Sequence, residues 1–331
     1  MFGTRKYRKK IFRKITTSIQ DLDKDYFRDG FRGDDRAIML GMRNLFFPEK
    51  FIEKIRYNQV LPLPSIFTKS KPLPEHDKSS AVMDAVNTLR RDGILILPSY
   101  AVKAADFLTA KYGLTPTKEK YGNNYGVVND NAPDPVVVDY LADPFLLSVV
   151  GEYQRVQPFL RMVPAVCEAY SSVNTEEVLA MQRENYTGRL DNNVRFNVPW
   201  HFDTVNLINI HLLLNDVPPT GTRMLYAKGS HKKHHLNLSD DEASFSEKYV
   251  RDHYEIVDCA GPRGTAVIFD ANGIHRMSPE KGAYRAFYGQ MITPGNNVID
   301  IHPLDIPENT LAHMSSLQRN YFSRVLRHEA K

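Results

Sequence analysis

The chain has 331 residues, of which 42% are hydrophobic, and a formal net charge of +4 at pH 7. This length permits one large domain or two small ones with a substantial core, and no apolar run approaches the ~20 residues of a membrane-spanning helix. The small net charge gives no indication of nucleic-acid binding. Cys167 and Cys259 are the two cysteines and form no C-x-x-C pattern, which argues against a disulfide framework and favours a reducing, cytoplasmic setting.

The N-terminal segment is rich in lysine and arginine, and no apolar stretch typical of a signal peptide follows it. Within residues 1–20, isoleucines recur every fourth position, so a helix would carry an apolar stripe with basic residues around it. Two interpretations stay open: a peripheral contact with a membrane surface, and a solvated helix packed on the domain. Prolines at 62, 64, 72 and 74 then indicate a linker or a surface arm. We therefore expect an arm over residues 1–79 and a domain over 80–331.

Three helices and one strand are predicted next. A helix over residues 80–91 has Ser80 as its expected N-cap. The apolar run at 94–97 predicts a buried strand, and a helix over 102–112 closes at Gly113. A third helix is predicted over 135–153, with a proline in its first turn.

From about residue 159 onward, alternating or apolar runs dominate and turn residues bound several of them. Helices followed by many short strands indicate an antiparallel sandwich or barrel flanked by helices. Two further helices are expected near 239–250 and 317–327. The runs predicted as strands are 160–171, 178–182, 194–200, 207–214, 224–227, 265–269 and 286–292.

A possible metal site begins with the H-x-D pair formed by His201 and Asp203. Positions i and i+2 of a strand face the same way, so both side chains can reach one ion while Phe202 points into the core. His275 returns after the predicted strand at 265–269. Two imidazoles and one carboxylate on one face of an iron leave three positions open, as in non-haem Fe(II) oxygenases. The alternatives are an H-x-D pair that occurs by chance and a histidine with an ordinary core or surface role.

Arg285 is the fourth residue of interest. It alternates with Tyr284 and Ala286 and therefore faces away from them. If its side chain enters the interior, a buried guanidinium needs an anionic partner, and the far carboxylate of a 2-oxo acid would supply one. The alternative is a surface salt bridge. Arg276, beside His275, is expected to be either solvated or packed behind that ligand.

Four further segments, at 92–98, 210–216, 227–232 and 264–270, occur in order around these residues. Over about residues 80–295, the ordered set resembles the phytanoyl-CoA dioxygenase-like family of Fe(II)/2-oxoglutarate-dependent oxygenases. The resemblance implies a double-stranded β-helix, a jelly-roll or cupin-like core, with helices outside it. The chain departs from the family at Ala227-Lys228 and over 218–223. These are turn positions, so the expected chemistry is unaffected.

The resemblance implies that His201, Asp203 and His275 hold Fe(II) and that Arg285 anchors 2-oxoglutarate. Gln182 and Arg195 lie on predicted strands ahead of the H-x-D pair, where they could contact cosubstrate or substrate or could be surface residues. O2 is the other cosubstrate, and ascorbate is the expected reductant in vitro.

The implied reaction is hydroxylation or desaturation of an aliphatic C–H of a small-molecule metabolite, with succinate and CO2 as co-products. The carboxylate of Asp203 argues against chlorination, which needs that position free for chloride. The basic N-terminus hints at an anionic substrate. Two alternatives are a non-catalytic jelly-roll module that binds a small molecule or sugar, and a cupin-like metal-dependent isomerase that uses no 2-oxo acid.

Overall fold

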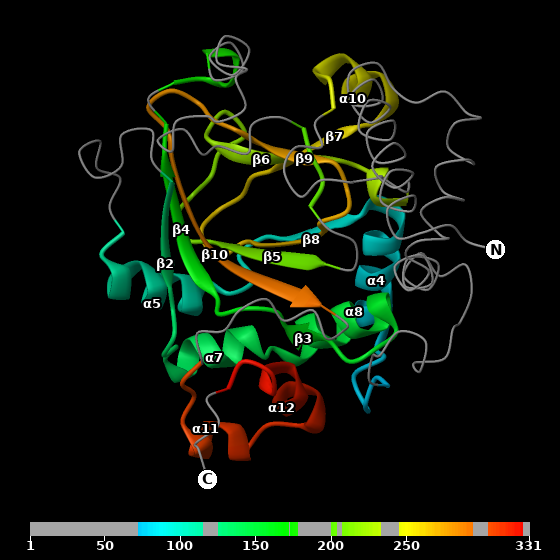
Figure 1. Ribbon diagram of the computed structural model, residues 1–331, viewed down its shortest axis with the longest axis vertical. Helices are drawn as coiled ribbons and strands as arrows, with labels where there is room; N and C mark the ends of the chain where they lie inside the picture. Colours follow the sequence, from blue (N-terminus) through cyan, green and yellow to red (C-terminus); the bar gives the residue numbers. More distant parts are fainter. Residues whose placement is uncertain are drawn as a thin grey trace, which may run out of the picture.

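The computed structural model describes residues 72–114, 125–171, 173–177, 200–203, 207–232, 245–293 and 304–326. Within these residues, two antiparallel sheets face each other, and helices cover the outer face of the larger one (Figure 1). This is the jelly-roll, double-stranded β-helix arrangement with flanking helices that the sequence predicts. Among the described helices, none combines the length and the apolarity needed to cross a bilayer.

The large sheet carries seven strands, and its neighbours are all antiparallel. The short strand β3 (Phe159–Leu160) pairs with one end of β10. The main order is β1 (Ile94–Leu97), β8 (Ala266–Asp270), β5 (Ile208–Leu213), β10 (Tyr284–Thr293), β4 (Ala165–Tyr170) and β2 (Tyr125–Asn129).

The small sheet has the order β7 (Ile256–Cys259), β6 (Arg223–Ala227) and β9 (His275–Ser278). His201 joins it through an antiparallel bridge to His275, and Trp200 forms a second bridge, to Phe245. The H-x-D pair therefore enters the fold at the edge of β9.

The two faces of the large sheet follow from the alternation of its residues. On β5, Ile208, Ile210 and Leu212 belong to the main core that packs against the helices, so Asn209 and His211 face the small sheet. Polar side chains within an otherwise apolar strand thus reach the space between the two sheets, which is where the metal-binding candidates lie.

The helical layer consists of α4 (Ser80–Asp92), α5 (Val102–Tyr112), α7 (Pro135–Leu141) and α8 (Pro144–Gln154), with α11 (Glu308–Ala312) and α12 (Ser316–Phe322) below them in Figure 1. The predicted bounds of α5 are confirmed, whereas α12 ends earlier than predicted. The N-cap of α4 is Ser79, whose hydroxyl accepts from the Val82 amide, and not Ser80. The helix predicted over 239–250 corresponds to α10 (Glu247–His253).

The single helix predicted over 135–153 is wrong, because the chain forms α7 and α8 instead. Pro144 disfavours helical geometry at the residue before it and has no amide hydrogen. The Asp143 side chain accepts from the Leu146 amide at 3.0 Å and so caps a new helix. Apolar residues continue on both sides of this break, so hydrophobic periodicity alone does not reveal it.

Several predicted elements differ from those observed. Strands β2, β7 and β9 and helix α11 were not predicted, and all are short. The strand predicted at 178–182 and most of the one at 194–200 lie outside the described residues, as does the basic segment 1–20. Residues 72–79 pack on the helices, where His76 Nε2 lies 2.6 Å from Glu152 Oε1. The domain boundary at residue 79 stays a prediction.

Gly93, between α4 and β1, is expected to resist substitution. Its φ is 79°, and a Cβ there would collide with the imidazole of His231 and the hydroxyl of Tyr226. We expect Gly93→Ala to lower the free energy of unfolding by about 2–4 kcal/mol, from left-handed strain plus overpacking. Urea denaturation measures this loss. Gly113→Ala is the matched control, since its φ is also positive, at 57°, but nothing lies within 4 Å of its Cβ; equal losses would contradict the packing argument.

Candidate metal centre

The structure brings His201, Asp203 and His275 together between the sheets. Their ligand atoms all lie within 4.8 Å of one another. Asp203 Oδ1 is 3.8 Å from Nε2 of His201, and Asp203 Oδ2 is 3.7 Å from Nε2 of His275. The three side chains thus converge on one point, and their assignment as iron ligands stays a prediction.

Backbone pairing positions the two histidines side by side. The amide of His201 donates to the carbonyl of His275 at 3.0 Å, and the reverse bond is 2.8 Å long. The imidazole centroids are 4.5 Å apart. Nδ1 of His275 lies 2.8 Å from the Gly273 carbonyl, an acceptor that requires the proton on Nδ1. Nε2 of His275 is therefore left with its lone pair available for a metal ion.

The carboxylate of Asp203 occupies the open side of the cluster. Its side chain is 33% exposed, compared with 18% for His201 and 8% for His275. Its amide donates to the Ala271 carbonyl at 2.8 Å, which ties the end of the H-x-D segment to the turn after β8. Asn209 Nδ2 approaches Asp203 Oδ2 at 3.5 Å from the large sheet. A substrate would therefore approach from the Asp203 side.

Arg285 lies in the interior, with only 1% of its surface exposed, so of the two alternatives left open by the sequence it is the buried one that the structure shows. It extends from β10 in the large sheet to β9 in the small one, where Nη1 lies 2.9 Å from Met277 Sδ. Its guanidinium also stacks on the Phe287 ring at 4.3 Å. Met277 follows His275 by two positions and so shares its face. The cation therefore lies in the same inter-sheet space as the metal-binding cluster.

His211 links Arg285 to the site. Its Nδ1 is 3.3 Å from Arg285 Nη2, and since a guanidinium can only donate, this nitrogen accepts. Burial, then the positive charge of Arg285 and then His275 hold the pKa of His211 well below its usual range. The imidazole is therefore neutral at physiological pH. Rings of Phe269 and Phe287 enclose it, with centroids at 5.0 and 4.1 Å.

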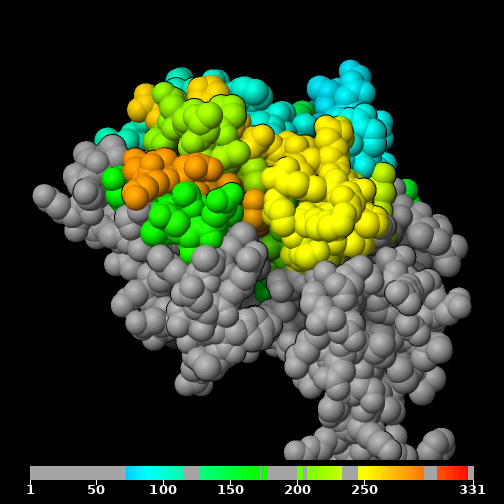
Figure 2. Space-filling view, turned by 90° about the horizontal axis from the view of Figure 1, so that it is seen from above, coloured from blue at the N-terminus to red at the C-terminus, as the bar shows by residue number. Residues whose placement is uncertain are grey.

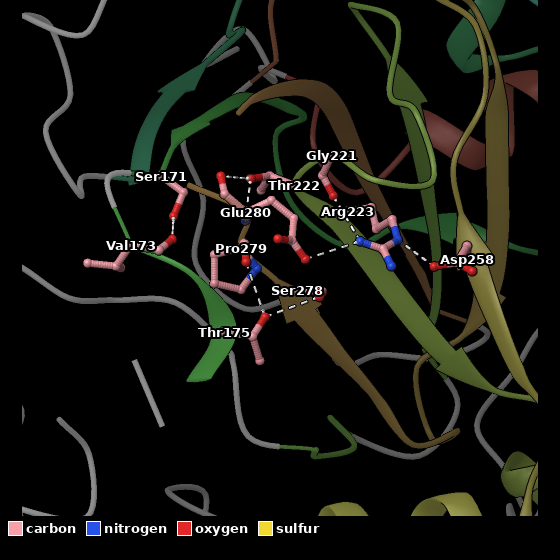
Figure 3. Close-up of polar contacts among 10 residues, drawn as sticks. All are labelled: Ser171, Val173, Thr175, Gly221, Thr222, Arg223, Asp258, Ser278, Pro279 and Glu280. Carbon is pink, nitrogen blue, oxygen red and sulfur yellow. Dashed lines mark hydrogen bonds and ion pairs between the residues drawn. The ribbon is translucent and has the colours of Figure 1, made fainter. Parts of the chain in front are cut away.

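A polar network surrounds the turn between β9 and β10 (Figure 3). The Glu280 amide donates to Thr222 Oγ1 at 3.0 Å. Arg223 approaches the Glu280 carboxylate at 3.6 Å and pairs with Asp258 of β7. This turn is thus joined to the start of β6 by a hydrogen bond to Thr222 and an ion pair with Arg223, which in turn pairs with Asp258 of β7.

The other residues singled out from the sequence differ in whether the structure describes them and in where it places them. Gln182 and Arg195 lie outside the described residues, so their assignment stays a prediction. The expectation that Arg276 might be solvated is wrong, because it is only 5% exposed and packs behind His275. The sequence analysis missed Asn209 and His211, although two polar residues alternating within an apolar strand were a usable signal. It also missed Arg161, described below.

The residues present fit an Fe(II) ion. Imidazole nitrogens and a carboxylate oxygen, with no thiolate in the cluster, match the two-histidine, one-carboxylate set of non-haem iron oxygenases. Protein ligands of this kind bind at about 2.0–2.2 Å, so converging atoms separated by 3.7 and 3.8 Å can share one ion. The hydrogen bond from His275 Nδ1 to the Gly273 carbonyl is the kind of contact that orients a metal-binding histidine.

Comparison with known proteins finds no matching family model and no matching curated protein. Solved structures with a similar fold include the epimerase SnoN in complex with Fe3+, α-ketoglutarate and nogalamycin RO (14% identity, TM-score 0.49, covering 69% of this chain and 93% of that one). EctD from S. alaskensis with 2-oxoglutarate and 5-hydroxyectoine is another (14%, 0.47, 68% and 82%). AviO1 from Streptomyces viridochromogenes Tue57 is a third (18%, 0.42, 70% and 100%). At such identities the chemistry must be argued from this chain's own residues.

Proposed function

We propose that this protein is an Fe(II)/2-oxoglutarate-dependent oxygenase that hydroxylates or desaturates an aliphatic C–H of a small molecule. The observation that supports this most strongly is the convergence of His201, Asp203 and His275 in the same interior space as buried Arg285. A metal-binding module without 2-oxo acid chemistry would not need that cation. The ordered sequence elements also support a relationship to the phytanoyl-CoA dioxygenase-like family.

In this proposal each residue has a defined task. His201, Asp203 and His275 hold Fe(II), and Arg285 binds the far carboxylate of 2-oxoglutarate through charge-assisted hydrogen bonds. Neutral His211 accepts from Arg285 and so orients its guanidinium. Phe269 and Phe287 keep water away from this end of the site, which strengthens the electrostatic attraction. Bound iron supplies the activation of O2, with oxidative decarboxylation of 2-oxoglutarate to succinate and CO2.

The functional test is succinate formation by anaerobically purified protein given Fe(II), 2-oxoglutarate and ascorbate and then exposed to air. We expect slow turnover in the absence of substrate, and its loss in His201→Ala and His275→Ala. His313→Ala, at an exposed position on the far helical layer, is the matched control and should retain turnover. Absence of both Fe(II) and 2-oxoglutarate binding in wild-type protein, measured by calorimetry, would instead favour the non-catalytic binding module.

Arg161 supports an anionic substrate. It follows β3, and its amide donates to the Met291 carbonyl on β10 at 2.8 Å. Met291 pairs with Asn209, which approaches Asp203. Partial burial lowers the pKa of Arg161, and the negative charge of Asp203 opposes that shift. A half-buried cation is therefore within electrostatic reach of the open side of the cluster, where a substrate carboxylate or phosphate would be stabilised.

We expect carboxylates or phosphate esters, and not their neutral analogues, to stimulate 2-oxoglutarate turnover in a substrate screen. Arg161→Gln should raise the KM for the stimulating anion by about 10- to 100-fold, the value of a charge-assisted hydrogen bond, without changing the KM for 2-oxoglutarate. Lys103→Gln, on the exposed face of α5, is the control for a general loss of positive charge. Equal stimulation of wild type and Arg161→Gln would contradict this assignment.

A further inference from the structure

The residues that flank the metal-binding side chains form a buried packing face on the opposite side of their segments. Because side chains alternate along extended backbone, the neighbours of His201, Asp203 and His275 point away from the cluster. They pack into a second, separate hydrophobic cluster with the segment that leads into and forms α10. The members of this cluster are Trp200, Phe202, Leu225, Ala227, Phe245, Tyr249, Val250 and Ile274.

Helix α10 therefore lies behind the metal centre, on the side away from the large sheet (Figure 1). The Phe245 amide donates to the Trp200 carbonyl at 2.7 Å, which fastens the entry of the helix to the H-x-D segment. In the space-filling view the yellow segment that includes α10 and β7 forms one continuous body (Figure 2), and β7 pairs with β6. A shift of α10 would therefore also move the segments that carry the candidate metal ligands.

One carboxylate connects both histidine-bearing segments to α10. Glu247 Oε2 accepts from the indole nitrogen of Trp200 at 2.5 Å and pairs with Nη1 of Arg276 at 3.1 Å. Trp200 directly precedes His201, and Arg276 directly follows His275. The Arg276 guanidinium also stacks on the Trp200 ring at 4.7 Å. Glu247 is itself held by Arg251, one turn along the helix, at 2.5 Å.

Glu247 is also the countercharge that makes this arrangement stable. Arg276 is only 5% exposed, whereas the Glu247 side chain that pairs with it at 3.1 Å is 38% exposed. Removing Glu247 would leave the buried guanidinium without its countercharge, whereas removing both members of such a pair is often tolerated. The Arg276 side chain, and the segment next to His275, therefore depend on Glu247 for their position.

Backbone hydrogen bonds hold His201 and His275 side by side, and β9 is also paired with β6 on its other side. The segment that carries His201 joins this sheet through isolated bridges to His275 and Phe245, so the direction of its imidazole also depends on how the side chains of the opposite face are held. We propose that Glu247 is a positioning residue for the metal centre: by holding Trp200 and Arg276 together, it fixes the relative direction of the His201 and His275 imidazoles. This inference rests on the metal-binding part of the proposed function and is independent of 2-oxoglutarate.

The test compares Glu247→Gln with wild-type protein in anaerobic titrations with Co(II), followed by calorimetry and by the visible absorption of the bound ion. We expect the Kd for Co(II) to rise by about 10- to 100-fold, as for other outer-shell partners of metal ligands, and the absorption bands to shift as the ligand geometry changes. Lys248→Gln, which removes an exposed pair with Asp252 on the same helix, should change neither. A purely structural role for Glu247 would lower the melting temperature only.

A second variant guards against a failure to fold. The double substitution Glu247→Gln with Arg276→Met removes both charges of the pair and keeps the volume similar, so it does not leave the buried Arg276 guanidinium uncompensated. It should fold and still bind Co(II) more weakly than wild type. Wild-type affinity and an unchanged spectrum in either folded variant would overturn the inference and leave the proposed function standing. Failure of the wild-type protein to bind Co(II) or Fe(II) would overturn both.

Discussion

Replacement of Asp203 by alanine is expected to abolish 2-oxoglutarate turnover and to raise the Kd for Fe(II) by more than about 100-fold. Loss of a hydrogen-bond partner of a metal ligand alone costs about 10- to 100-fold in metal affinity, and among the described residues of this cluster the anionic ligand is Asp203. Two neutral imidazoles would leave a divalent ion without a compensating negative charge. Anaerobic calorimetry with Fe(II) measures the binding, and succinate formation measures the turnover.

Asp203→Asn tests the negative charge of the side chain separately from its size and shape. The amide keeps the volume of the side chain and the contact with Asn209, so the fold should be unchanged, while the anionic ligand is lost. We expect Fe(II) binding between that of wild type and that of Asp203→Ala, and no turnover above background. Asp216→Asn, in an exposed turn far from the cluster, is the matched control. Full turnover in either Asp203 variant would mean that this carboxylate does not hold the iron.

Arg285→Gln is expected to raise the Kd for 2-oxoglutarate by about 100-fold or more, because removing one partner of a buried ion pair costs about 3–5 kcal/mol. Fe(II) affinity should change little, since the guanidinium contacts Met277 and His211 and is not a metal ligand. Arg285→Lys should recover only part of the affinity, because an ammonium cannot make the bidentate contact. Calorimetry with the Fe(II)-loaded protein under anaerobic conditions measures these values.

A truncated cosubstrate provides an independent control for Arg285. 2-Oxobutyrate has the 2-oxo acid group but lacks the far carboxylate. Wild-type protein should bind it much more weakly than 2-oxoglutarate, and Arg285→Gln should bind the two compounds with similar affinity. If Arg285→Gln still prefers 2-oxoglutarate as strongly as wild type, the far carboxylate is bound elsewhere, and a basic residue such as Arg161 becomes the candidate.

The fold class, and the convergence of His201, Asp203 and His275, could be inferred from the sequence because their signals are local, while the roles of these residues and of Arg285 stay predictions. An H-x-D pair in extended backbone has only one arrangement in which both side chains reach an ion, and an arginine between apolar residues in a buried strand must face the opposite side. The same reasoning gave α5 its bounds, since Gly113 ends it in the left-handed conformation. Each of these predictions depends on residues within a few positions of one another.

The parts that could not be predicted depend on contacts between distant segments. Glu247 meets Trp200 across 47 positions, and no pattern near either residue indicates the other. Arginine is usually found at the protein surface, and Arg276 is buried because α10 covers it. The break between α7 and α8 is a different case: Asp143-Pro144 is a local signal, but the apolar residues on both sides of it outweighed it in the sequence analysis.

The bridge between His201 and His275 has a consequence for how the protein folds. It closes a long loop, so the cluster forms only after strands far apart in sequence have paired, and such non-local pairing slows folding. The unfolded chain cannot present the three ligands together. A metal ion held by this cluster, as proposed above, would therefore favour the native state, by about 2.7 kcal/mol at one hundred times the Kd. On that proposal, the concentration of free iron would affect how much of the protein stays folded, before any catalysis begins.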